Sequence, residues 1–155
     1  MANEKELRLA KSAFDACCEA LDKRGWVYDK DEEKLRIDVG VTGEDLPMDF
    51  IVRFDPEYQI IKLQSLLPFK MNEEKRVEGA IAINSINFSL ADGSFDYDFG
   101  DGSIAFRLTS SFRGSLIDDD LLSYMIDISC HTIDEYNDRL LMLSKGKISW
   151  SDIVE

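Results

Sequence analysis

Residues 77–90 read VEGAIAINSINFSL, and this stretch decides the fold. When its residues are placed every 100°, as in an α-helix, apolar side chains fall on two nearly opposite faces. One face carries Val77, Ile81, Asn84 and Phe88. The other carries Gly79, Ala82, Ile83, Ile86 and Leu90. A helix that is apolar on both sides must be covered on both, and one small sheet covers only one. Another helix of the chain or a second copy of the protein must therefore supply the other cover.

This helix is predicted to begin at Asn72, whose side chain can cap free backbone amides, and to run to Phe88 or Leu90. The chain before it alternates apolar and polar residues with the period of two that a half-buried strand shows. Turn residues interrupt this alternation at 29–34, 43–47 and 55–57. We therefore predict four strands in a meander, over residues 26–28, 35–41, 48–54 and 61–67.

Two further helices and a hairpin complete the predicted elements. Leu7, Ala10, Phe14, Cys17 and Leu21 recur at steps of three and four, which predicts an amphipathic helix that ends near Gly25. Residues 95–99 and 104–108 alternate around Gly100-Asp101-Gly102, which is typical of a hairpin. A long apolar stripe from about Asp119 predicts a closing helix that ends at Gly146.

The fold class follows from this order of elements. We predict an α+β protein in which an antiparallel sheet of about six strands packs with three helices, in the order α-β-β-β-β-α-β-β-α. The 155 residues fit one domain over 1–155, and 45% apolar residues suffice for a core. Residues 147–155 form a C-terminal tail that is too apolar for a solvated linker, so part of it should dock.

The charge of the chain restricts its partners. Thirty-one acidic residues against 18 basic ones give a net charge of −13, which repels nucleic acid and anionic membrane surfaces. The simplest role of that charge is solubility. The first residues lack the features of a signal peptide, and no apolar run approaches the ~20 residues that cross a bilayer. We expect a cytoplasmic protein with three free cysteines.

The sequence contains no complete catalytic or metal-binding motif. Asp96, Asp98 and Asp101 resemble the start of a calcium loop, but Arg107 stands where the bidentate glutamate is needed. His131 is the only histidine, with Asp127 and Glu135 one helical turn away on either side. This trio could grip a divalent cation weakly, although a solvated helix face is the simpler interpretation. No catalytic residue, cofactor or bound metal is predicted.

The remaining evidence is a resemblance. Gly25-Trp26-Val27-Tyr28, the segment AINSIN at 82–87, and GSFDY at 93–97 followed by DGSIAFR at 101–107 resemble the YbjN family. Members of this family are described as bacterial sensory transduction regulators, and the predicted order of elements is similar to the type III secretion chaperone-like fold. The resemblance spans roughly residues 7–143.

Secretion chaperones of this shape are acidic homodimers that use the central helix for dimerisation and bind a segment of a client protein. The resemblance therefore implies a non-enzymatic, homodimeric protein-binding or chaperone-like regulator. One face of the central helix would form its dimer surface, and small residues there would permit close approach: Gly79, Ala82, Ile83, Ile86 and Leu90. An extra strand in the first meander departs from the chaperone pattern and leaves the dimer geometry open. Two alternatives remain: a sensor that binds a small ligand between sheet and helices, and a metal-assisted enzyme centred on Asp127, His131 and Glu135.

Overall fold

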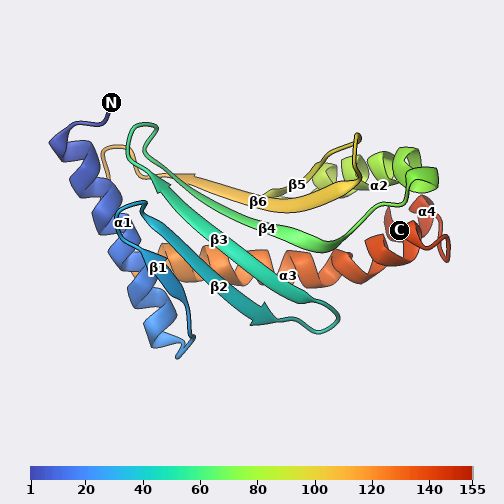
Figure 1. Ribbon diagram of the computed structural model, residues 1–155, viewed down its shortest axis with the longest axis horizontal. Coiled ribbons are helices and arrows are strands. Elements are labelled where there is room, and N and C mark those ends of the chain that lie inside the picture. Colours follow the sequence, from blue (N-terminus) through green and yellow to red (C-terminus); the bar gives the residue numbers. More distant parts are fainter. Residues whose placement is uncertain (155) are drawn as a thin grey trace.

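A computed structural model describes residues 1–154, so that Glu155 of the predicted tail lies outside the described residues. Six antiparallel strands form one sheet in the order β1-β2-β3-β4-β6-β5. Figure 1 shows helices α1 and α3 behind this sheet, while α2 and α4 lie at one of its ends. The predicted α+β class, the six-stranded antiparallel sheet and the predicted order of elements along the chain are therefore confirmed.

Helix α1 (Glu4–Lys23) begins where the sequence places a strong cap. The Asn3 side chain accepts a hydrogen bond from the Glu6 amide at 2.9 Å, and the Glu6 carboxylate accepts one from the Asn3 amide at 2.8 Å. This reciprocal pair satisfies two amides that a helix start leaves free. Phe14 on this helix is buried against Phe54 of the sheet. The two rings meet edge to face, with their centres 5.7 Å apart.

Strands β1 (Asp29–Asp31), β2 (Arg36–Thr42), β3 (Pro47–Asp55) and β4 (Ile60–Lys70) form the predicted meander. The first strand lies three residues later than predicted, because the aromatic residues before it pack on α1 instead. Tyr28 donates a hydrogen bond to the Asp22 carboxylate at 2.9 Å, and the Arg24 guanidinium lies 5.0 Å from the Trp26 ring centre. The prediction of a strand at 26–28 is therefore wrong.

The central helix also begins later than predicted. Asn72 makes no capping hydrogen bond to the helix; its side chain donates to the Ser144 carbonyl at 2.7 Å. A short 3-10 turn, η1 (Glu73–Lys75), precedes α2 (Arg76–Ser89). The hairpin of β5 (Ser94–Tyr97) and β6 (Ser103–Ser111) follows.

Helix α3 (Asp119–Ser144) has the predicted acidic start, where the Asp118 side chain accepts from the Leu121 amide at 3.3 Å. The tail contains a fourth helix that the sequence analysis did not predict, α4 (Trp150–Val154). Ile153 on this helix is buried in the core. The tail therefore docks on its own chain, next to α2.

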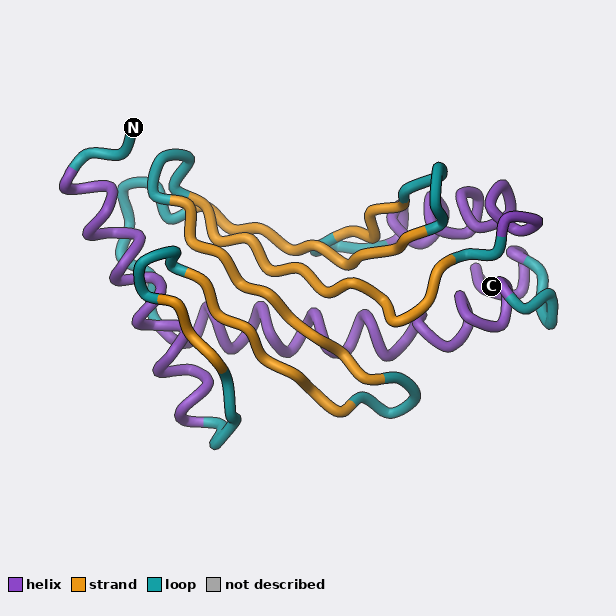
Figure 2. Tube along the Cα trace, viewed as in Figure 1, coloured by secondary structure: helices purple, strands orange, loops and turns teal. Residues whose placement is uncertain are grey.

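The core fills the space between the sheet and the helices, with buried side chains from all four α-helices and from strands β2 to β6. The opposite, outer face of the sheet has no helix over it within residues 1–154, as the tube in Figure 2 shows. Along β2 and β3 the residues alternate accordingly between buried and partly or fully exposed positions. No helix of the described residues is long and apolar enough to span a bilayer.

Candidate protein-binding surface

The face of α2 that was predicted as a dimer surface lies inside the protein. Ala82, Ile83 and Ile86 are buried with at most 4% of their surface exposed. Gly79 is buried too, and a Cβ atom there would lie only 3.0 Å from the Met71 side chain and the Tyr97 hydroxyl. The chain itself covers this face with β5, α3 and α4. Of the five predicted residues only Leu90 is partly exposed, so in this fold the face has no room for a second copy.

The opposite face of α2 is open. Phe88 has 93% of its surface exposed, Val77 63% and Ile81 39%. We call these three residues the α2 stripe. At a rise of about 1.5 Å per residue they extend over about 17 Å of one helix face. Large apolar side chains scattered singly on a surface are ordinary, but three aligned on one helix make a candidate contact surface.

The α2 stripe sits on a firmly held helix. The Tyr97 hydroxyl donates to the Arg76 carbonyl at 2.8 Å, and the Arg76 guanidinium donates to the Gly100 carbonyl at 2.8 Å. At the other end of the helix, Asn87 makes two hydrogen bonds to the backbone of Phe95. Helix and hairpin are therefore connected at both ends, which fixes the orientation of the stripe.

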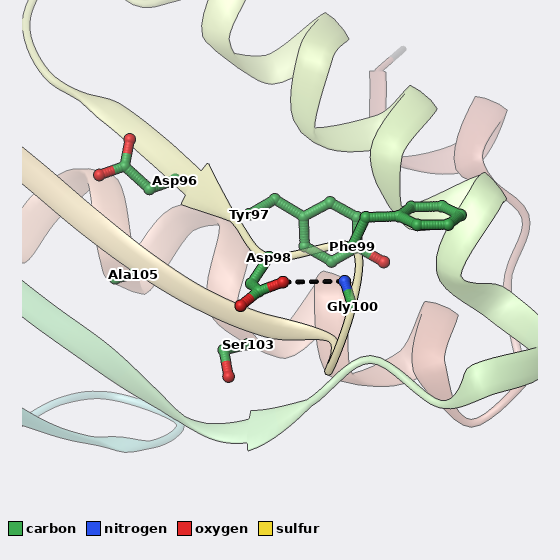
Figure 3. A pocket seen from close by; sticks show the side chains of 7 residues that line it. All are labelled: Asp96, Tyr97, Asp98, Phe99, Gly100, Ser103 and Ala105. Atoms are coloured by element: carbon green, nitrogen blue, oxygen red, sulfur yellow. Dashed lines mark hydrogen bonds between the residues drawn. The ribbon is translucent and has the colours of Figure 1, made fainter.

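A shallow hollow of about 490 Å³ lies beside the hairpin turn. Figure 3 shows its lining, in which Tyr97 and Phe99 project to the side on which α2 lies. Phe99 is 55% exposed and meets Tyr97 edge to face, with ring centres 6.4 Å apart. The half-buried Tyr97 and the exposed Phe99 therefore give this hollow an aromatic wall next to the carboxylate of Asp98.

The three aspartates that resemble the start of a calcium loop accept hydrogen bonds from groups of the protein. Asp96 accepts two hydrogen bonds from Arg107, at 2.7 and 3.0 Å. Asp101 accepts from the hydroxyl and amide of Ser103 and from Lys70, and these bonds lower its pKa to about 2. Within residues 1–154 no group of three or more His, Cys, Asp or Glu side chains could hold a metal ion.

The trio on α3 is not assembled as a metal site. His131, Asp127 and Glu135 are all exposed. The Asp127 carboxylate forms an ion pair with Arg24 at 2.7 Å, so it already has a cationic partner at the C-terminal end of α1. This geometry favours the solvated-face interpretation over a metal centre.

The cysteines are thiols in unactivating surroundings. Burial, followed by the neighbouring Cys18, raises the pKa of Cys17 to about 12. Burial likewise raises the pKa of Cys130 to about 11. A nucleophilic cysteine needs a lowered pKa, so neither thiol is prepared for catalysis.

The structure offers little space for a small ligand between the sheet and the helices, where the sensor alternative places it. The region between sheet and helices is filled by core side chains. A separate hollow between α2, α3 and α4 is about 140 Å³, lined by Ser85, Ser89, Glu135 and Arg139 among others. Ligand pockets are usually larger, about 300–1,000 Å³, so this hollow gives weak support to the sensor alternative.

No protein-family model matches the chain, and no curated protein matches its sequence significantly. Among solved structures, a crystal structure of YbjN from E. coli superposes with a TM-score of 0.56. The match covers 78% of this chain and 85% of YbjN, at 12% sequence identity. The fold is YbjN-like. At this identity the likeness shows the architecture, and function must be argued from the residues.

Two of the motifs that resemble the YbjN family meet in the structure. Asn87 of the segment 82–87 binds the backbone of Phe95 in the segment 93–97. In this chain the two motifs therefore form one contact between α2 and β5. The 100° projection had already placed Val77, Ile81 and Phe88 on one face. What the sequence did not reveal was that this face, rather than the face of small residues, is the open one.

Proposed function

We propose that this protein is a non-enzymatic, protein-binding regulatory domain that engages a protein through the α2 stripe, with a second copy of itself as the first partner. The observation that carries this proposal is the exposure of Val77, Ile81 and Phe88 on a helix whose other face is already buried in the chain. Exposed apolar stripes of this kind lose unfavourable contact with water when two copies pack together.

Two further observations support a binding role. Asp96 and Asp127 are paired with arginines, His131 is exposed to solvent, and burial raises the pKa of the Cys17 thiol. Protein contact is therefore the best-supported role. The structural neighbour YbjN is described as a candidate transcription regulator, which suits a regulatory domain. A chaperone-like activity, in which the protein holds a client, is a narrower form of the same proposal.

Sedimentation velocity of the purified chain tests the proposal. The wild-type protein should sediment as a dimer, and the variant Ile81→Glu/Phe88→Glu as a monomer with an unchanged circular dichroism spectrum, because charges would be placed in an apolar contact. The matched control is Val27→Glu/Leu116→Glu, which changes two residues of 90% and 79% exposure that lie outside α2. A monomeric wild type, or a control that dissociates equally, would count against the stripe as the dimer contact.

A further inference from the structure

Three cations line up across the open face of the sheet. The strand register places Arg36 of β2 directly opposite Arg53 of β3, and Arg53 directly opposite Lys62 of β4. Residues directly opposite one another in neighbouring strands project from the same face of the sheet. We call these three residues the cationic row. The row belongs to the outer face, away from α3 in Figure 2.

This row is unusual in a chain with a net charge of −13. Like charges directly opposite each other in a sheet are destabilising. Arg36 forms an ion pair with Asp38, whose carboxylate lies 2.6 Å from the guanidinium and offsets this repulsion. Arg53 has only a hydrogen bond of 3.4 Å to Gln64, and Lys62 makes no ion pair within residues 1–154. Arg53 and Lys62 are therefore two adjacent positive charges that form no ion pair within residues 1–154, although Asp38 interacts with Arg53 at longer range.

An apolar hollow continues the same face. It measures about 500 Å³, and Ile51, Leu66, Pro47 and Pro68 are among its lining residues. Leu66 is 62% exposed. At about 3.3 Å per residue, Ile51 lies about 7 Å along β3 from Arg53, and Leu66 lies about 13 Å along β4 from Lys62. Asp49 on the wall of this hollow makes no ion pair within residues 1–154. The face thus has a cationic end and a largely apolar hollow at the other end, where the carboxylates of Asp29 and Asp49 make no ion pair within residues 1–154.

We infer that the outer face of the sheet binds a short segment of a partner protein that is acidic at one end and apolar at the other. Its carboxylates would pair with Arg53 and Lys62, and its apolar side chains would fill the hollow about 13 Å away, which is four extended residues. A basic residue at the apolar end would suit Asp49. Charge complementarity at both ends selects this occupant, because each end of the face carries charge without a partner.

Nucleic acid fits this face less well. A phosphate backbone is anionic along its whole length, whereas the hollow is lined by Asp29, Asp38 and Asp49 and the chain is strongly acidic overall. The inference goes beyond the proposed function by assigning a second surface and the chemistry of its partner, and it does not depend on the α2 stripe.

Fluorescence anisotropy with the full chain tests the inference. The probe is the fluorescein-labelled octapeptide EESTLSLK, whose first glutamate and first leucine are four residues apart; QQSTLSLK and a labelled 20-bp DNA duplex are the comparison probes. The variant Arg53→Gln/Lys62→Gln removes the two unpaired charges. The matched control Lys5→Gln/Arg8→Gln removes two exposed charges of α1 that make no ion pair within residues 1–154.

We expect saturable binding of the acidic peptide by the wild type, weakened at least tenfold in Arg53→Gln/Lys62→Gln and changed less than twofold in the control. The glutamine peptide should also bind at least tenfold more weakly, and 500 mM salt should weaken the acidic peptide relative to 50 mM because exposed ion pairs are screened. Ile81→Glu/Phe88→Glu should bind the peptide as the wild type does, which separates this inference from the stripe.

Three results would overturn the inference. The first is that the wild type fails to bind the acidic peptide, and the second is that it binds the acidic and the glutamine peptides equally. The third is that Arg53→Gln/Lys62→Gln binds the acidic peptide as tightly as the wild type while circular dichroism shows that variant to be folded. Tighter binding of the duplex, lost in the same variant, would assign the row to nucleic acid instead. Dissociation of a wild-type dimer by Arg53→Gln/Lys62→Gln would show that a second copy covers this face.

Discussion

The side-chain amide of Asn87 takes the place of a neighbouring strand at the edge of the sheet. Its nitrogen donates to the carbonyl of Phe95 at 2.9 Å, and its oxygen accepts from the Phe95 amide at 2.8 Å. Within the described residues β5 pairs with β6 on one side only, so this amide satisfies the other side of the strand. An open strand edge invites pairing with other chains. Asn87 thus closes part of an edge and fixes α2 with the same two bonds.

Asn87→Ala should lower the free energy of unfolding by about 2 kcal/mol, because it leaves a backbone donor and acceptor of the buried Phe95 without partners. Asn87→Asp keeps the acceptor but places a carboxylate oxygen against the Phe95 carbonyl oxygen, so it should be destabilising as well. Urea denaturation measures both. Asn84→Ala, at an exposed position of the same helix, is the control and should stay within about 0.5 kcal/mol of wild type. An equal loss at Asn84 would mean that the edge contact is not the cause of the loss at Asn87, because alanine has a higher helix propensity than asparagine.

Gly102 is required where the hairpin meets the start of the central helix. Its φ of +82° is unfavourable for other residues, and a Cβ atom there would collide with the Met71 carbonyl oxygen. Gly102→Ala should therefore lower the free energy of unfolding by about 3 kcal/mol. Gly114 has a similar φ of +66° with open space around it, so Gly114→Ala should cost only the conformational part, about 1–2 kcal/mol. Thermal or urea denaturation that shows equal losses would remove the backbone collision as the cause.

The period of the apolar residues was enough to predict the sheet and the three long helices. It failed at the first strand because Trp26 and Tyr28 have high strand propensity but pack on α1. Asp29–Asp31 has low strand propensity and forms β1 only by pairing with Arg36–Asp38. A tertiary contact thus overrode local preference in both segments.

The candidate surfaces depend on contacts between distant parts of the chain. The sequence showed that α2 is apolar on two faces, but it could not show that Ile153 and Tyr97 reach the face of small residues. The cationic row could not be predicted from the sequence for a related reason. Arg36, Arg53 and Lys62 are far apart in the sequence, and only the register of β2, β3 and β4 sets them side by side.

The raised pKa of Cys17 predicts a thiol that is inert until the protein unfolds. At pH 8, Ellman's reagent should label Cys17 at the rate of global unfolding, and 6 M guanidinium should expose all three cysteines. Since burial raises the pKa from 9.0 to about 12, the unfolded chain releases a proton that the folded chain keeps. The contribution of Cys17 to stability is therefore complete below pH 9 and declines as the pH rises above it. Rapid labelling of Cys17 in the folded protein would contradict this prediction and would make Cys17 a candidate reactive thiol.

Lys62→Glu should raise the free energy of unfolding by about 0.5 kcal/mol, because it replaces a repulsion across the strands by an ion pair with Arg53. Lys147→Glu is the matched control: it makes the same change in net charge at an exposed position that forms no ion pair within residues 1–154, and it should not stabilise. Urea denaturation at low salt compares the two. If the row serves to bind acidic segments, Lys62→Glu must also abolish binding of the acidic octapeptide, so that stability rises as affinity falls. A purely structural lysine would lower stability when replaced, and that outcome would contradict the assignment of the row to a partner.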